Sequence, residues 1–186
     1  MLDDKEYERL WNILEYNVST RTSLLTFSFT TVLAVIGVAI GTESKDFSVY
    51  IYLMPYCLII PFTARIVYYR ITHAHISAFL IEYAPEKMKF HQKTKFVAEK
   101  QNKLFSIIAI LVNYEMFVLA ITCAIIFEQK YFNTVNSFGK KEIFIIIVPI
   151  LLSLVVFFII SYGYNYSKIK NNYLSKWNEL HIVENS

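Results

Sequence analysis

The sequence predicts an all-α membrane protein, a bundle of four transmembrane helices with cytoplasmic helical extensions and with both termini in the cytoplasm. Two observations predict this fold. Apolar residues make up 55% of the 186 residues, and they collect in four long blocks with almost no charge. Lysine and arginine are concentrated in the termini and in the connection between the second and third blocks. We expect residues 1–186 to form a single membrane domain.

Each apolar block is long enough to cross a bilayer. A helix needs about 20 apolar residues for this, because it rises about 1.5 Å per residue. The predicted spans are 22–41, 48–69, 104–127 and 143–165; Arg65 is the one charged residue in the second, and Glu115 in the third. Lipid offers the backbone no hydrogen-bond partner, so the runs must be helices or a closed barrel, and their continuous apolar pattern excludes the barrel.

The orientation follows from the basic residues, which favour the cytoplasmic side of a membrane. Segments 1–21, 70–103 and 166–186, with the span ends that adjoin them, hold most of the 18 lysines and arginines. These three segments are therefore placed in the cytoplasm. An even number of spans agrees, because it puts both termini on one side. The exceptions, in the two outer connections, are Lys45, Lys130, Lys140 and Lys141.

The cytoplasmic segments have the pattern of amphipathic helices. Apolar and aromatic residues recur at helical spacing around Trp11 in the first segment and around Trp177 in the last. In the middle segment, Pro85 should end the helix that continues from the second span, because proline disfavours helix in the preceding residue. We expect these helices to extend the bundle as a short stalk. The alternative is that some of them lie flat on the lipid headgroups.

Glu115 is the most informative single residue, because an ionised carboxylate in the middle of a span costs about 2.5–3.5 kcal/mol even on insertion scales. With Asn113 and Arg65 it forms the candidate intramembrane polar or gating group. One hypothesis is an ion or proton site; the other is a protonated side chain that shares a hydrogen bond between helices. Thr30 and Tyr56 are expected at a similar depth. Arg65 lies about 10 Å nearer the cytoplasm along the helix axis and is expected to reach the headgroups.

The first span carries a stripe of small residues at three- and four-residue steps. Small side chains let two helix backbones approach closely and gain van der Waals contact. Such a face can form a homo-oligomer, or it can pack against another helix of the same subunit, which is the commoner use. The small-residue stripe consists of Thr26, Thr30, Ala34, Gly37 and Gly41.

The basic middle connection is a candidate contact for lipid or for a partner. Lysines near the anionic inner leaflet contribute about 1 kcal/mol each to membrane binding. We expect membrane lipids as the main contact; an acidic cytoplasmic protein is the alternative, and direct nucleic-acid binding is less expected. The residues concerned are Lys87, Lys89, Lys93 and Lys95.

Catalytic and metal-binding patterns are weak in this sequence. His73 and His75 are two residues apart on a predicted helix, so they point to different faces and cannot share one metal ion. Arg70 and His75 have the R-x-x-x-x-H spacing of ribonuclease HEPN domains, but this string is short and common. Four glycines are too few for a nucleotide-binding loop. We therefore expect no enzyme activity, no cofactor and no metal.

Four segments resemble a class of small bacterial membrane proteins of anti-phage defence systems, for example the membrane subunit of the Kiwa system. They are "EYERLWNILEY", "STRTSLLTF", "VLAVIGVAIG" and "RITHAHISAFLIEYAPEK". The resemblance covers the general layout over most of the chain and carries over no functional residue. It implies a protein of the bacterial inner membrane that oligomerises and engages a cytoplasmic partner.

The sequence thus predicts an inner-membrane subunit that oligomerises and couples the bilayer to a cytoplasmic protein. In anti-phage defence it would act as a membrane sensor or as a pore-forming effector. The alternative is a small ion channel or transporter that uses Glu115.

Overall fold

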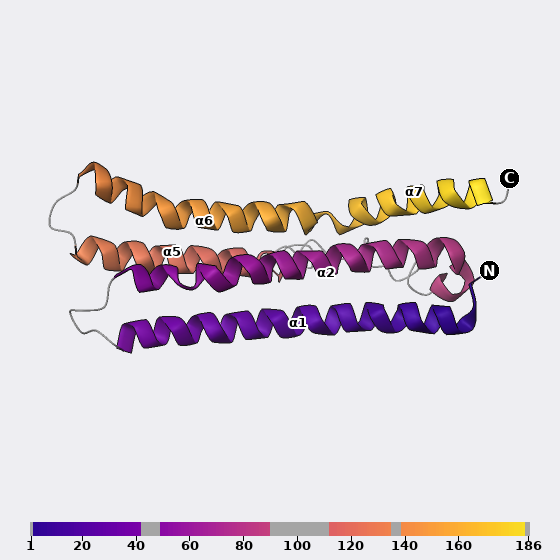
Figure 1. The fold of residues 1–186 in the computed structure, drawn as a ribbon, viewed down its shortest axis with the longest axis horizontal. Helices are drawn as coiled ribbons and strands as arrows, with labels where there is room; N and C mark the ends of the chain where they lie inside the picture. The colour runs from indigo at the N-terminus through magenta and orange to yellow at the C-terminus, as the bar shows by residue number, and fades with distance from the viewer. Residues whose placement is uncertain (1, 42–48, 90–111, 135–138, 185–186) are drawn as a thin grey trace, which may run out of the picture. The chain divides into compact units, whose positions relative to one another are not determined.

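The computed structural model describes residues 2–41, 49–89, 112–134 and 139–184, and the elements in these residues are helices (Figure 1). This confirms the predicted all-α fold for the described part of the chain. The elements are α1 (Asp4–Gly41), the 3₁₀-helix η1 (Val49–Leu53), α2 (Tyr56–Tyr83), α5 (Glu115–Thr134), α6 (Lys140–Tyr164) and α7 (Tyr166–Glu184).

Three helical stretches among the described residues are long and apolar enough to cross a membrane. They are Asp4–Gly41, Tyr50–Tyr83 and Glu142–Tyr164, and they contain the predicted first, second and fourth spans almost entirely. The described part of the predicted third span lies largely in α5. Positions 104–111 of that span lie outside the described residues.

Helix α1 joins the predicted N-terminal amphipathic segment and the first span in one helix of 38 residues. It begins after Asp3, whose backbone carbonyl accepts a hydrogen bond from Tyr7 N over 2.9 Å. Asp4 and Glu6 in the first turn suit the partial positive charge at a helix N-terminus. The helix contains no proline and ends at Gly41.

The predicted second span, 48–69, is not one continuous α-helix. It starts as η1, and α2 begins only at Tyr56. Pro55 explains the break, because it has no N–H group and disfavours α-helix at Met54. The backbone here instead forms hydrogen bonds between residues three apart, as in a 3₁₀-helix. Met54 N donates to Ile51 O and Cys57 N donates to Met54 O, each over 3.0 Å.

Two helix boundaries have clear local causes. Helix α2 ends at Tyr83, directly before Ala84 and Pro85, as the sequence predicts. Helix α7 begins after Asn165, whose side-chain oxygen accepts a hydrogen bond from Lys168 N over 3.1 Å. Asparagine is a favoured residue at this capping position because it satisfies an otherwise unpaired backbone N–H.

The chain divides into two compact units. The first unit comprises Met1–Thr22, Val67–Val112 and Gly163–Ser186, and the second comprises Ser23–Ile66 and Asn113–Tyr162. Three of the four boundaries lie within three residues of the borders predicted between the cytoplasmic segments and the spans, and the boundary after Val112 lies nine residues from its predicted border. The division therefore follows the change in composition along the chain.

The second unit has a core built from all four of its α-helices. Its largest fully buried side chains include Tyr56 and Ile59 of α2, while Phe144 and Phe158 of α6 are 73% and 67% exposed. A helix with apolar side chains on its outer face suits a lipid environment. The core residues are Val32, Ile36, Tyr56, Ile59, Met116, Leu119, Ala120, Cys123, Val156 and Ile160.

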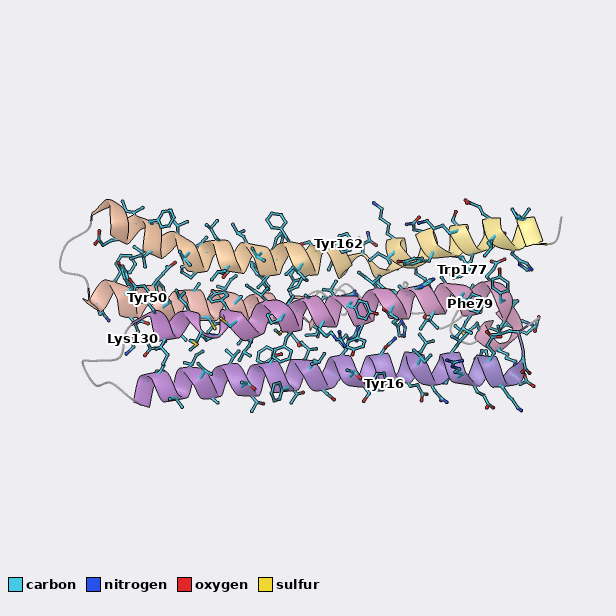
Figure 2. The ribbon with its side chains drawn as sticks, viewed as in Figure 1. Tyr16, Tyr50, Phe79, Lys130, Tyr162 and Trp177 are labelled. Atoms are coloured by element: carbon cyan, nitrogen blue, oxygen red, sulfur yellow. The ribbon has the colours of Figure 1, made fainter. Side chains whose placement is uncertain are left out.

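The first unit has its own smaller core. Leu14 of α1, Leu80 of α2 and Met88 are buried together, and half-buried apolar side chains pack around them. Large aromatic side chains add to this unit, among them Phe79 and Trp177 (Figure 2). The amphipathic pattern of the segments predicted to be cytoplasmic therefore provides side chains that pack within the first unit.

Candidate functional site

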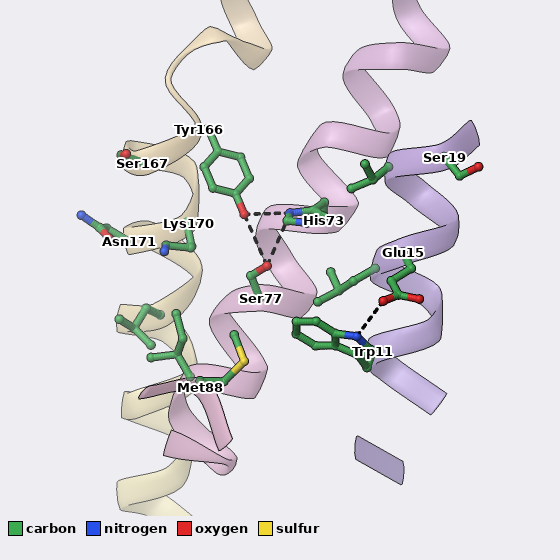
Figure 3. A pocket seen from close by; sticks show the side chains of 14 residues that line it. Trp11, Glu15, Ser19, His73, Ser77, Met88, Tyr166, Ser167, Lys170 and Asn171 are labelled. Atoms are coloured by element: carbon green, nitrogen blue, oxygen red, sulfur yellow. Dashed lines mark hydrogen bonds between the residues drawn. The ribbon is translucent and has the colours of Figure 1, made fainter. Parts of the chain in front are cut away.

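The first unit contains a pocket of about 860 Å³ between α1, α2 and α7 (Figure 3). This volume lies within the range of about 300–1,000 Å³ that is usual for small-ligand sites. Apolar side chains form most of its wall. The lining residues are Trp11, Leu14, Glu15, Val18, Ser19, His73, Ser77, Ile81, Met88, Tyr166, Ser167, Lys170, Asn171 and Leu174.

A cluster of three polar side chains lies at one end of the pocket. Tyr166 Oη is 2.8 Å from His73 Nδ1 and 3.3 Å from Ser77 Oγ. Ser77 Oγ is in turn 3.4 Å from His73 Nδ1. His73 and Ser77 are four residues apart on α2, so they lie on the same face of the helix. The cluster therefore joins the start of α7 to α2.

The environment of Tyr166 indicates the sign of the charge at this end. Burial raises the pKa of the Tyr166 hydroxyl above its ordinary value of 10.0. The hydrogen bond with Ser77 and the charges of Arg70 and Arg21 act in the opposite direction. The hydroxyl is therefore neutral near pH 7, and two guanidinium groups give this end of the pocket a positive potential.

The other end of the pocket is mainly apolar, with the Glu15 carboxylate beside Trp11 as its charged group. Met88 and Leu14 are almost fully buried there, at 3% and 5% exposure. Trp11 keeps its ring in the wall while its Nε1 donates a hydrogen bond to Glu15 Oε1 over 3.0 Å. Figure 3 shows Met88 and Trp11 at the opposite end from Tyr166.

At the end of α6, just before α7, the backbone lies against side chains of α2. Arg70 Nη2 donates a hydrogen bond to Tyr164 O over 3.1 Å. One residue earlier, Gly163 lies so close to α2 that an added Cβ would be 2.7 Å from Val67 Cγ1. Glycine is required at this position because the neighbouring side chain leaves no space for a methyl group.

The two histidines of α2 have different surroundings, as their spacing predicts. His73 faces the pocket, whereas His75 stacks on Tyr173 and Trp177 of α7, with ring centroids 4.5 and 5.4 Å apart. Trp177 also meets the ring of Phe79 edge-on at 5.0 Å. Among the described residues, no group of three histidine, cysteine, aspartate or glutamate side chains has the arrangement of a metal site.

The predicted contact lysines are placed only in part. Lys87 forms an ion pair with Asp4 and lies over the ring of Tyr7, 4.7 Å from its centroid. Lys89 forms an ion pair with Glu86. The other two predicted contacts, Lys93 and Lys95, lie outside the described residues. The two described lysines therefore have acidic partners within the chain.

Glu115 lies in the first turn of α5 rather than in the middle of a regular helix. The helical pattern is interrupted at Tyr114, whose carbonyl accepts hydrogen bonds from Phe117 N and Val118 N at 2.9 and 3.0 Å. The first turn of a helix is favourable for a carboxylate because of the helix dipole. Two polar residues were predicted to act with Glu115. Asn113, two residues before it, is half-buried, and Arg65 on α2 is exposed.

A groove of about 460 Å³ in the second unit brings Glu115 next to the small-residue stripe. Two stripe residues, Thr26 and Thr30, line this groove together with the carboxylate. Thr30 and Glu115 are therefore neighbours, and their common depth in a membrane stays a prediction. The lining residues are Leu25, Thr26, Phe29, Thr30, Leu33 and Glu115.

The small-residue stripe is exposed over its whole length. It lies on the face of α1 opposite the buried residues Val32, Ile36 and Ala39. A Cβ built on Gly37 or Gly41 meets no atom within 4 Å. Gly37 and Gly41 at the end of the stripe therefore leave open space around the helix backbone, whereas Thr26 and Thr30 face the groove beside Glu115.

The hydrogen bonds of one buried tyrosine in the second unit were not predicted from the sequence. Tyr56 Oη donates a hydrogen bond to Ala120 O over 2.7 Å and lies 2.9 Å from Ser153 Oγ. Pro149 O is a further acceptor at 3.3 Å. One hydroxyl on α2 thus contacts both α5 and α6. The signal in the sequence is only that a tyrosine buried in a span needs a hydrogen-bond partner.

Comparisons with protein-family models, with curated proteins and with solved structures gave no match. Function is therefore inferred from the residues of this chain.

Proposed function

We propose that the chain crosses the inner membrane of a bacterium four times, with both termini in the cytoplasm, and that it self-associates along α1. The distribution of basic residues supports this topology, since most of them belong to the first unit. This proposal adds the third predicted span, 104–127, to the three apolar helical stretches, and α5 supplies its part from Glu115 onward.

The observation that carries self-association is the exposure of the small-residue stripe. Lipid tails are as apolar as leucine, so helices in a membrane associate mainly through close backbone packing and hydrogen bonds. Gly37 and Gly41 leave the backbone of α1 open to such an approach. Thr26 and Thr30 lie on the same face, where the Thr30 hydroxyl donates a hydrogen bond to Thr26 O within the helix. A second copy can therefore approach α1 more closely than lipid chains pack against it.

The first unit is proposed to be the part that meets a cytoplasmic protein. It carries basic and aromatic side chains, and its C-terminal helix ends in exposed apolar residues such as Ile182 and Val183, at 64% and 70% exposure. Exposed apolar residues at a helix end favour a protein contact. In this proposal the protein couples the state of the bilayer to that partner, as a sensor or pore-forming effector in anti-phage defence.

Fluorescence energy transfer between two labelled populations in liposomes tests self-association. Gly37→Leu should lower the transfer efficiency about tenfold at fixed protein-to-lipid ratio, because bulk at this position prevents backbone contact. Val155→Leu is the matched control, since Val155 is exposed on α6 away from the stripe. Equal transfer for wild type and Gly37→Leu would contradict the proposal.

A second candidate function is ion conduction or transport that uses Glu115. The groove that joins this carboxylate to Thr26 and Thr30 favours it, because carboxylate and hydroxyl oxygens can replace the hydration shell of a cation. Ion flux into liposomes separates the two functions. Conduction predicts flux in the wild type and its loss in Glu115→Gln, whereas the proposal of a coupling subunit predicts no basal flux.

A further inference from the structure

We propose that the pocket of the first unit binds a single-chain anionic amphiphile, such as a long-chain fatty acid or a lysophospholipid. The acidic headgroup lies at the end formed by Tyr166 and Lys170, and the tail lies against Trp11 and Met88. This inference concerns a different site from the small-residue stripe and does not depend on self-association.

The lining residues change from polar to apolar in the same direction on the two helices that carry the polar cluster. On α2, His73 and Ser77 precede Ile81, and on α7, Lys170 and Asn171 precede Leu174. Because both helices change from polar to apolar along their length, the pocket has a polar end and an apolar end. A ligand that satisfies both has a polar head and an apolar tail.

The charges favour an acidic head. Lys170 lines the polar end, with its Nζ 6.0 Å from the ring centroid of Tyr166. The positive charges of Arg70 and Arg21 also lower the pKa of Tyr166 at this end. The acidic side chain in the lining, Glu15, lies beside Trp11 rather than beside Tyr166, and accepts a hydrogen bond from Trp11 Nε1. A carboxylate or phosphate is therefore better accommodated at this end than a neutral or cationic group.

The direction in which the lining changes from polar to apolar distinguishes a free amphiphile from a bilayer lipid. The polar end is formed by Ser19 and Tyr166, which adjoin the predicted spans 22–41 and 143–165, while the apolar end is formed by Trp11 and Met88, which lie further along the chain from the predicted spans. A phospholipid that keeps its tails in the bilayer would need the reverse order. The occupant must therefore leave the bilayer as a whole molecule, which favours one chain over two.

Fluorescence quenching by brominated hexadecanoic acid tests the site on the full-length chain in neutral phosphatidylcholine nanodiscs. The chain contains two tryptophans, so Trp177→Phe leaves Trp11 as the reporter at the apolar end. Bromines at the tail end should quench Trp11 strongly and saturably, and bromines beside the carboxylate should quench it weakly. A fatty acid that only partitions into the bilayer gives the opposite order, because its tail end lies at the bilayer centre.

The matched variants test the headgroup. Lys170→Gln should raise the half-saturating mole fraction about three- to fivefold, as expected for loss of a partly exposed charge contact. Lys176→Gln is the control, because it removes the same charge from α7 outside the pocket. The alcohol with the same brominated tail should bind much more weakly than the acid. The two tails partition into the bilayer equally well, so the difference in binding reports the headgroup contacts alone. Equal binding of alcohol and acid would overturn the proposal.

Two further measurements keep the result independent of how Trp177→Phe folds. In Trp11→Phe, the remaining Trp177 stacks between helices outside the pocket and should not be quenched. Native mass spectrometry of the wild-type chain should detect one hexadecanoate or lysophosphatidylglycerol adduct per chain, lost in the pocket-filling variant Leu174→Phe. Quenching that rises linearly without saturation, or adducts unaffected by Leu174→Phe, would exclude the site.

Discussion

The hydroxyl of Tyr56 on α2 donates a hydrogen bond to the backbone carbonyl of Ala120 on α5, and the two atoms are 2.7 Å apart. Tyr56 is 2% exposed, so the bond is formed inside the core of the second unit. The hydroxyl also lies 2.9 Å from Ser153 Oγ on α6. A single side chain therefore links three helices through polar contacts in an apolar environment.

Replacement of this hydroxyl should weaken the second unit. Tyr56→Phe removes the hydrogen bonds but keeps the ring, so we expect a loss of about 0.5–2 kcal/mol in the free energy of unfolding, as measured for hydrogen bonds between membrane helices. Steric-trap unfolding in bicelles measures it. Tyr162→Phe serves as the control because Tyr162 is 77% exposed, and an equal loss in both variants would show that the junction contributes nothing.

Gly163 should not tolerate a side chain. The added methyl of Gly163→Ala would lie 2.7 Å from Val67 Cγ1, and a valine in a helix has little rotamer freedom to move away. We expect a loss of about 1–3 kcal/mol in the free energy of unfolding, as for overpacked cores. Val67→Ala in the same chain should restore most of it. Gly37→Ala meets no atom within 4 Å and should leave the stability of the monomer unchanged.

The ion pair between Asp4 and Lys87 should make the stability of the first unit depend on pH. A hydrogen bond from Lys87 and its charge hold the pKa of Asp4 below the ordinary value of 3.8. Because the folded pKa is the lower one, the pair stabilises the fold above the unfolded pKa, and this contribution is lost as the pH falls through the folded pKa. The difference in melting temperature between wild type and Asp4→Asn should therefore be present at about pH 6 and vanish at about pH 2.

Asp3→Asn is the control for this titration, because Asp3 precedes α1 and its backbone carbonyl, not its carboxylate, makes the bond to Tyr7. A constant difference between wild type and Asp4→Asn at every pH would mean that the aspartate acts through helix capping rather than through its charge.

Docking of α7 onto α2 should depend on Trp177. Its ring stacks on His75 at 5.4 Å and contacts Phe79 at 5.0 Å. Trp177→Ala removes this buried area, so amide hydrogen exchange in α7 should become at least about tenfold faster as local opening becomes easier. Leu180→Ala, at a side chain that is 42% exposed, should change the exchange little. Unchanged exchange in Trp177→Ala would place the stabilising contacts of α7 elsewhere, for example in the His181–Glu82 pair.

The sequence is sufficient for the helices because their signal is local. A run of about 20 apolar residues predicts a span, and Pro85 predicts where α2 ends, without knowledge of any partner. The start of the second span is predicted less well. Its composition is apolar from Ser48 onward, but Pro55 delays the α-helix to Tyr56. Hydropathy measures the environment of a segment and not the hydrogen bonding of its backbone.

The sites are harder to predict because they depend on which helices meet. His73 and Ser77 have the right spacing to share a face of α2, yet nothing local indicates that Tyr166, 93 residues after His73, completes the cluster. Similarly, the composition of the small-residue stripe is visible in the sequence, but its exposure is not. The placement of Glu115 at a helix start also depends on the interruption at Tyr114.

Helix α1 carries residues of both proposed binding surfaces in one continuous helix. It supplies Leu14 and Val18 to the pocket and Ala34 and Gly37 to the small-residue stripe, with no proline along its 38 residues and no glycine before Gly37. Leu14 and Ala34 therefore belong to one continuous helix, so a proline introduced between them is expected to disturb both surfaces.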